Sequence, residues 1–173
     1  MSEYRVGQGF DIHLLVLGRP LFLGGIKFES PVGLSGHSDA DVVLHSLTDA
    51  LLGASGHRDI GQRFPDTDER WKNASSKLFV REALRLMKES GFRVGNVDIT
   101  VFASSPPIAP HAEEMCRAIA TLLGCEHSAV NIKAKTFQGI SEIGKGKAIA
   151  ALTVVLLGRE GGKKKEEGRR KRW

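Results

Sequence analysis

Residues 38–54 read SDADVVLHSLTDALLGA, and apolar side chains recur in this stretch at the three- and four-residue spacing of a helix. Ser38 stands at the expected N-cap, Asp41 forms a capping-box variant three residues later, and a glycine just beyond the stretch ends the helix. Because positions four apart share one face of a helix, Asp41, His45 and Asp49 are predicted to form a polar stripe. The stretch therefore predicts an amphipathic helix that carries an imidazole between two carboxylates.

A predicted strand before this helix carries a second imidazole and a carboxylate. It reads YRVGQGFDIH and ends at His13, and the two-residue period of a strand places Asp11 and His13 on one face. One Asp and two His, with a fourth position left open, are the donors of a catalytic zinc site. Asp11, His13 and His45 are therefore predicted to bind Zn²⁺ or another divalent transition metal. Asp49 is predicted to support a ligand, whereas Asp41 either caps the helix or has a substrate or second-shell role.

The rest of the chain predicts further strands and helices within one domain, residues 1–158. A hairpin is expected over residues 20–28, followed by a loop to His37, and a long polar loop over 56–68 is expected to be functional. The remaining predicted elements are a helix over 75–90, a strand over 94–103, a helix from Pro110 to Gly124, and strands over 130–136 and 148–157. This order favours an α/β (α+β) two-layer sandwich, with a mixed β-sheet and three main helices packed on one face.

The charge of the chain is concentrated at its C-terminal end. Residues 159–173 contain eight of the 25 Lys and Arg and three of the 20 Asp and Glu, which leaves 17 of each kind in positions 1–158. The net charge of +5 therefore belongs to a basic tail, predicted to be disordered, and nucleic acid is not the expected partner.

Other features of the composition favour an intracellular enzyme. The 41% hydrophobic content is sufficient for a globular core, and two cysteines make no disulfide framework. The N-terminal residues lack the apolar run of a signal peptide, and the sequence contains no predicted membrane span. We therefore expect a cytoplasmic protein without a membrane partner.

Three blocks of the chain resemble the 2-C-methyl-D-erythritol 2,4-cyclodiphosphate synthase family in their order and internal spacing. They are GxGFDxH over residues 7–13, HSDxDVxLHxLTDALLG over 37–53, and DIGxxFPDTD over 59–68. The resemblance extends from about residue 4 to residue 157 and continues through GNVD at 95–98 and VNIKA at 130–134.

The resemblance implies an enzyme of the non-mevalonate isoprenoid pathway, a phosphorus–oxygen lyase. Its reaction converts 4-diphosphocytidyl-2-C-methyl-D-erythritol 2-phosphate into 2-C-methyl-D-erythritol 2,4-cyclodiphosphate and CMP. The substrate's 2-phosphate attacks the β-phosphorus with the help of zinc and a second metal, Mg²⁺ or Mn²⁺. The family is a homotrimer built around its sheets, with each active site between two subunits, so the small-molecule cytidine substrate contacts two chains.

The family's functional positions carry over to this chain as follows. The family's zinc ligands correspond to Asp11, His13 and His45. The residues that donate hydrogen bonds to the phosphates in the transition state correspond to His37 and Thr136. Substrate contacts are implied for Ser38, for the loop residues Asp59, Ile60, Gly61, Phe64, Pro65, Asp66, Thr67 and Asp68, for Ala103, Ser104, Ser105, Pro106, Pro107, Ile108 and Ala109, and for Ala134, Lys135, Phe137, Glu142 and Lys145.

The last block departs from the family pattern. Gln138 stands where the family has the glutamate that holds the second metal, and an amide oxygen ligates a hard cation without adding charge. Lys145 replaces an arginine, which keeps the charge but loses the bidentate fork, and Pro107 replaces a frequent lysine. We therefore expect weakened affinity for the second metal.

Two other functions remain open at this point. A zinc-dependent phosphoester hydrolase would use the same ligands but incorporate water and release a linear phosphate product. The chain could also be a non-catalytic trimeric binding module. In that case Gln138 and Pro107 reflect lost activity, and the basic tail contacts a nucleic acid or an acidic partner.

Overall fold

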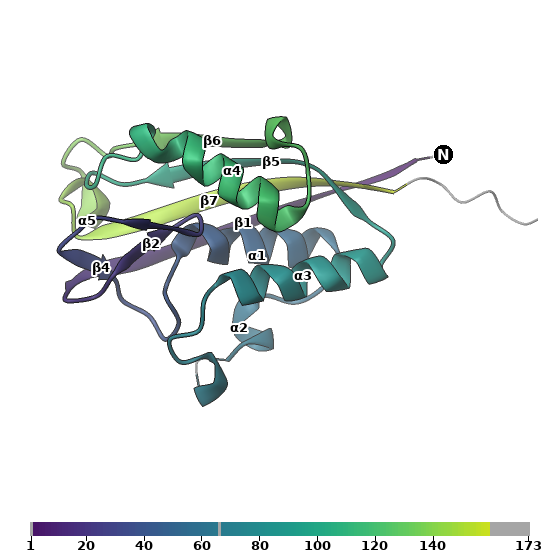
Figure 1. The fold of residues 1–173 in the computed structure, drawn as a ribbon, viewed down its shortest axis with the longest axis horizontal. Coiled ribbons are helices and arrows are strands. Elements are labelled where there is room, and N and C mark those ends of the chain that lie inside the picture. Colours follow the sequence, from purple (N-terminus) through teal and green to yellow (C-terminus); the bar gives the residue numbers. More distant parts are fainter. Residues whose placement is uncertain (1, 66, 160–173) are drawn as a thin grey trace, which may run out of the picture.

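The computed structural model describes residues 2–65 and 67–159, and its centre is a five-stranded mixed sheet (Figure 1). The strand order is β4-β1-β7-β5-β6, and within it only β5 and β6 run parallel. The strands are β1 (Glu3–Leu17), β4 (Val32–Leu34), β5 (Arg93–Phe102), β6 (Val130–Lys135) and β7 (Ala148–Arg159), with a separate hairpin of β2 (Leu21–Leu23) and β3 (Ile26–Phe28). The predicted mixed sheet is confirmed.

Three long helices cover one face of this sheet, as predicted (Figure 1). They are α1 (Val42–Ala54), α3 (Lys77–Glu89) and α4 (Ala112–Leu123). Helix α1 packs on β1 and β7, α4 packs beside β6, and α3 packs on α1, so α1 is buried between the sheet and α3. Short helices α2 (Ile60–Arg63) and α5 (Ser141–Gly144) lie in the connections. No helix within the described residues is long and apolar enough to cross a membrane.

Two glycines of β1 allow the close contact between this strand and α1. A Cβ atom added at Gly7 would lie 2.0 Å from the carbonyl oxygen of Ala50, and one at Gly9 would lie 1.9 Å from that of Ser46. Any side chain at either position would therefore separate the helix from the strand. Because His45 precedes Ser46, this contact sets the distance between the α1 imidazole and the side chains of β1.

The other face of β1 is apolar and exposed in the single chain. Tyr4 is 67% exposed, Val6 68%, Phe10 54%, Ile12 47% and Leu14 59%. These side chains alternate along the strand with the residues that face α1, as the two-residue period requires. Large exposed apolar side chains gathered on one strand face are typical of a protein–protein contact.

Several boundaries differ from those predicted. Helix α1 begins at Val42 with Asp41 as its N-cap, so the prediction of Ser38 as the cap is wrong. Strand β4 occupies part of a predicted loop, because its residues pair with β1, and α2 forms within the long loop. Arg159 ends β7 and forms an ion pair with Glu3, although it was assigned to the tail. The rest of the tail, residues 160–173, and Asp66 lie outside the described residues.

Candidate metal centre and active site

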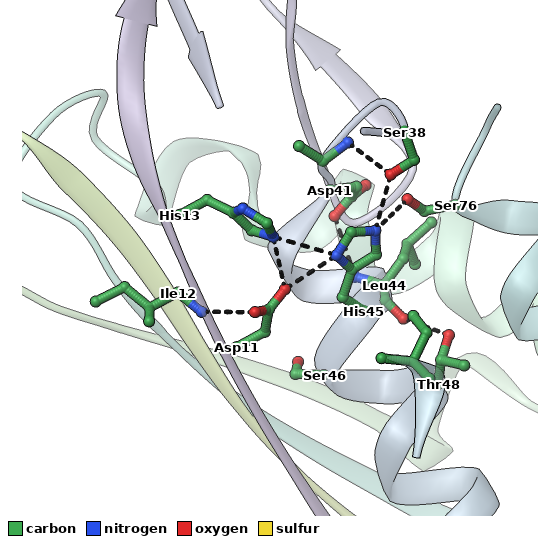
Figure 2. A network of polar contacts seen from close by, with 12 residues as sticks. Asp11, Ile12, His13, Ser38, Asp41, Leu44, His45, Ser46, Thr48 and Ser76 are labelled. Atoms are coloured by element: carbon green, nitrogen blue, oxygen red, sulfur yellow. Dashed lines mark hydrogen bonds and ion pairs between the residues drawn. The ribbon is translucent and has the colours of Figure 1, made fainter. Parts of the chain in front are cut away.

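Asp11, His13 and His45 meet in space as the sequence predicted (Figure 2). Asp11 and His13 project from the same face of β1, and His45 projects toward them from the first turn of α1. Asp11 Oδ2 lies 2.9 Å from His13 Nε2 and 2.9 Å from His45 Nδ1. The two imidazole nitrogens are 3.3 Å apart. Three candidate ligand atoms thus converge on one point within 4.8 Å of one another.

The donor set fits a divalent transition metal. Two imidazole nitrogens and one carboxylate oxygen are the usual ligands of a catalytic zinc ion, and the half-buried setting leaves one side open for a further ligand. Burial alone would raise the pKa of Asp11, but the hydrogen bonds from His13 and His45 outweigh it and hold that pKa well below its usual range. Asp11 therefore stays ionised at any physiological pH, as a metal ligand must.

A cavity of about 440 Å³ opens beside the three residues. Ile60, Gly61 and Phe64 reach it from the α2 segment, so several predicted substrate residues do lie around the candidate ligands. The full lining consists of Asp11, His13, Gly36, His37, Ser38, His45, Ile60, Gly61, Phe64, Trp71 and Phe79. Of these, Gly36, Trp71 and Phe79 were not predicted from the sequence.

The missed aromatic residues form one wall of the cavity. Ring centroids of Phe64 and Phe79 lie 4.6 Å apart, those of Phe64 and Trp71 5.2 Å, and those of His45 and Phe79 5.8 Å. Phe79 lies three residues after Ser76, the N-cap of α3, and its place in an amphipathic helix predicted only burial in the core.

Two polar contacts hold the α2 segment and the following turn over the cavity. Asp49 accepts a hydrogen bond from the N–H of Ile60 at 2.7 Å, and His37 Nε2 lies 3.2 Å from the carbonyl oxygen of Asp68. Burial raises the pKa of Asp49, although the hydrogen bond from Ile60 opposes the shift. Asp49 thus holds the loop through this hydrogen bond, and its support of a ligand imidazole stays a prediction.

Asp41 has a structural role that the sequence left open. Its fully buried carboxylate caps α1 by accepting from the N–H groups of Val43 and Leu44, and it also accepts from those of Gly24 and Gly25 in the β2–β3 turn. Burial raises the pKa of Asp41, and these N–H donors lower it. The alternative of a cap residue is confirmed, and the substrate or second-shell role stays a prediction.

On its far side His45 contacts Ser38, a predicted substrate contact, and Ser76, which was not predicted from the sequence. His45 Nε2 lies 2.8 Å from Ser76 Oγ and 3.1 Å from Ser38 Oγ (Figure 2). Ser76 in turn donates hydrogen bonds to Asp39 from both its hydroxyl and its backbone N–H. These contacts join α3 to the loop before α1, and sequence spacing alone gives no signal for them.

The other predicted residues that the structure describes lie outside the cavity lining of this chain. Thr136 and Gln138 are exposed just beyond β6, and Phe137 packs on Phe102 with ring centroids 5.5 Å apart. Glu142 forms ion pairs with Lys145 at 3.3 Å and Lys147 at 3.2 Å. The segments over 103–109 and 134–145 gather where β5 and β6 end, and the single chain does not bring them to the metal ligands.

The chain matches a described family and several characterised proteins over nearly its whole length. A model of the YgbB family matches residues 4–158. The 2-C-methyl-D-erythritol 2,4-cyclodiphosphate synthase of Bordetella avium (strain 197N) is 54% identical over 157 residues, which cover 91% of this chain and 97% of that protein.

Solved structures show the same fold. The bifunctional IspDF from Campylobacter jejuni gives a TM-score of 0.88 at 40% identity, over 92% of this chain and 43% of that chain. IspF of Plasmodium falciparum, solved as a CDP complex, gives a TM-score of 0.81 at 35% identity, over 91% of this chain and 97% of that chain. This chain thus spans less than half of the bifunctional protein and nearly all of the Plasmodium one.

Proposed function

We propose a function for this chain from one premise: the chain belongs to the YgbB family, whose matched members are 2-C-methyl-D-erythritol 2,4-cyclodiphosphate synthases. It converts 4-diphosphocytidyl-2-C-methyl-D-erythritol 2-phosphate into the 2,4-cyclodiphosphate and CMP, as a phosphorus–oxygen lyase of isoprenoid biosynthesis. The observation that carries this function is the convergence of Asp11, His13 and His45 at the edge of a cavity of about 440 Å³.

The reaction needs positioning and charge neutralisation more than proton transfer. The attacking 2-phosphate belongs to the substrate and is already anionic, so the chain need not supply a base. We infer that Asp11, His13 and His45 hold a zinc ion, which supplies Lewis-acid stabilisation of phosphate charge when bound. The cavity walls exclude water from the β-phosphorus, which favours cyclisation over hydrolysis.

His37 is placed to act on the phosphates from this chain. Its Nε2 faces a carbonyl oxygen, that of Asp68, so this nitrogen carries a proton that it can donate. A phosphate oxygen in the cavity would be a stronger acceptor than the carbonyl, because charge-assisted hydrogen bonds are about twice as strong as neutral ones. We therefore assign His37 to transition-state stabilisation, with Ser38 and the α2 segment as substrate contacts.

In this proposal a second chain completes the active site. Residues 103–109 and 134–138, together with Glu142 and Lys145, are expected to bind the cytidine diphosphate part, yet they lie outside the cavity of their own chain. The exposed apolar face of β1 supports assembly, because burial of such a face stabilises a subunit contact. We propose a homotrimer in which the neighbouring chain supplies these residues, Thr136 and, at Gln138, the weakened site for Mg²⁺ or Mn²⁺.

The test is an assay of the purified protein with the cytidylylated substrate, with and without zinc and magnesium. CMP and the cyclic diphosphate should appear only with metal, and His45→Ala should abolish both products. A linear phosphate product would instead identify a hydrolase. Sedimentation equilibrium should give three chains, and a stable monomer would contradict the shared site. A cytoplasmic location stays a prediction from the sequence.

A further inference from the structure

The hydrogen bonds behind His45 form a chain that ends at the carboxylate of Asp39. Asp39 accepts from the hydroxyl of Ser76, from the backbone N–H of Ser76 at 3.0 Å, and from that of Asp41 at 3.3 Å. A carboxylate accepts hydrogen bonds and donates none, so the proton between Ser76 and Asp39 belongs to the serine hydroxyl. The direction of the first link is therefore fixed.

The second link follows from the first. Because Ser76 Oγ uses its only proton in the hydrogen bond to Asp39, it can only accept a hydrogen bond from His45 Nε2, which is 2.8 Å away. Ser38 Oγ, which already accepts from the N–H of Ala40 at 3.1 Å, lies 3.1 Å from the same nitrogen. His45 Nε2 must then carry a proton, which leaves Nδ1 as the ring nitrogen that can bind a metal.

His45 Nδ1 points at the candidate metal position. His45 Nδ1 lies 2.9 Å from Asp11 Oδ2 and 3.3 Å from His13 Nε2, on the open side of the ring (Figure 2). Ser76 is completely buried at the start of α3, so solvent does not compete for its hydroxyl. Packing of α3 against α1 thus holds the ring through Nε2 while Nδ1 faces the other two candidate ligands.

We propose that Ser76, held by Asp39, is the positioning residue that fixes the tautomer and orientation of His45 for metal binding. The proposal rests on the metal centre of the proposed function and adds the residues that prepare it. Partners of this kind raise ligand basicity and hold the ring, and their loss costs about 10–100-fold in metal affinity. Ser76 and Asp39 touch neither substrate nor metal in this assignment.

The first experiment measures zinc affinity by competition with a chromophoric chelator. Ser76→Ala and Asp39→Asn should each bind zinc about 10–100-fold more weakly than the unaltered protein. Ser75→Ala is the matched control, since Ser75 is the exposed neighbouring serine, and it should bind zinc normally. Equal affinity of Ser76→Ala and the control would overturn the proposal. An unaltered protein that binds no zinc would instead overturn the metal centre itself.

The second experiment needs no variant and so does not depend on the folding of one. Long-range ¹H–¹⁵N spectra of the zinc-loaded protein should show His45 bound through Nδ1, with a slowly exchanging proton on Nε2. Zinc attached at Nε2, or a rapidly exchanging Nε2 proton, would contradict the hydrogen-bond chain. In a folded Ser76→Ala variant, the same proton should exchange faster, because its acceptor is gone.

Discussion

Replacement of Gly9 by alanine tests whether the contact between β1 and α1 sets the geometry of the metal centre. The new Cβ would lie 1.9 Å from Ser46 O, 2.8 Å from Ala50 N and 2.9 Å from Asp49 Cβ, whereas real Cβ contacts essentially never fall under 3.0 Å. Strand and helix must therefore separate by about 1 Å. His45, one residue before Ser46, moves with the helix.

Both stability and catalysis should respond to this separation. Overpacking costs up to about 3 kcal/mol, which in a domain of this size lowers the melting temperature by roughly 6–12 °C. A displacement of about 1 Å exceeds the tolerance of roughly 0.2 Å for metal–ligand distances and can cost on the order of 100-fold in rate. Differential scanning fluorimetry, chelator competition for zinc and the CMP-release assay measure the three effects.

Gly53→Ala provides the control within the same helix. A Cβ at Gly53 would meet no atom within 4 Å, so alanine there should raise stability by about 0.5–1 kcal/mol and leave zinc affinity unchanged. If Gly9→Ala melted within about 2 °C of the unaltered protein and bound zinc equally well, the strand–helix contact would not set the ligand geometry.

Three further predictions concern the metals, the loop and the pH dependence. Gln138→Glu should lower the magnesium concentration for half-maximal activity, because a carboxylate adds charge to the second-metal site; an unchanged titration would exclude Gln138 as a ligand. Asp49→Ala should raise KM while zinc affinity stays constant, since it removes the acceptor for the Ile60 N–H. A fall in zinc affinity as large as the rise in KM would contradict the assignment of Asp49 to the loop. In the metal-free protein, burial lowers the pKa of His13, but the hydrogen bond to Asp11 outweighs it and raises that pKa above 6.5. The contribution of this pair to stability is therefore complete below pH 6.5 and is lost as pH rises through the raised pKa. The lowered pKa of Asp11 keeps the pair intact down to about pH 4. Urea unfolding should give a higher midpoint at pH 6 than at pH 8.5, and a flat profile or a higher midpoint at pH 8.5 would refute the pairing.

The metal ligands were predictable from the sequence because local periodicity determines them. The two-residue strand period places Asp11 and His13 together, and the blocks that resemble the family add His45. The role of Asp41 could not be chosen in advance, because its partners Gly24 and Gly25 come from another element. Local spacing shows only that such a carboxylate is available.

The support behind His45 was beyond sequence reasoning for a related reason. Ser76 and Asp39 are separated by 37 positions and meet only when α3 packs against α1. Strand β4 was missed because its three residues, Val32–Leu34, become a strand only by pairing with β1. Contacts between distant segments, rather than local propensity, decide these features.

The strand order determines when the centre can form during synthesis. β7 lies between β1 and β5 in the sheet, yet it is the last of the described strands in the chain. While a ribosome is still translating the chain, Asp11 and His13 sit on a strand that lacks its main partner. We therefore expect metal binding to be a late event, so nascent chains stalled before residue 148 should not retain the ion.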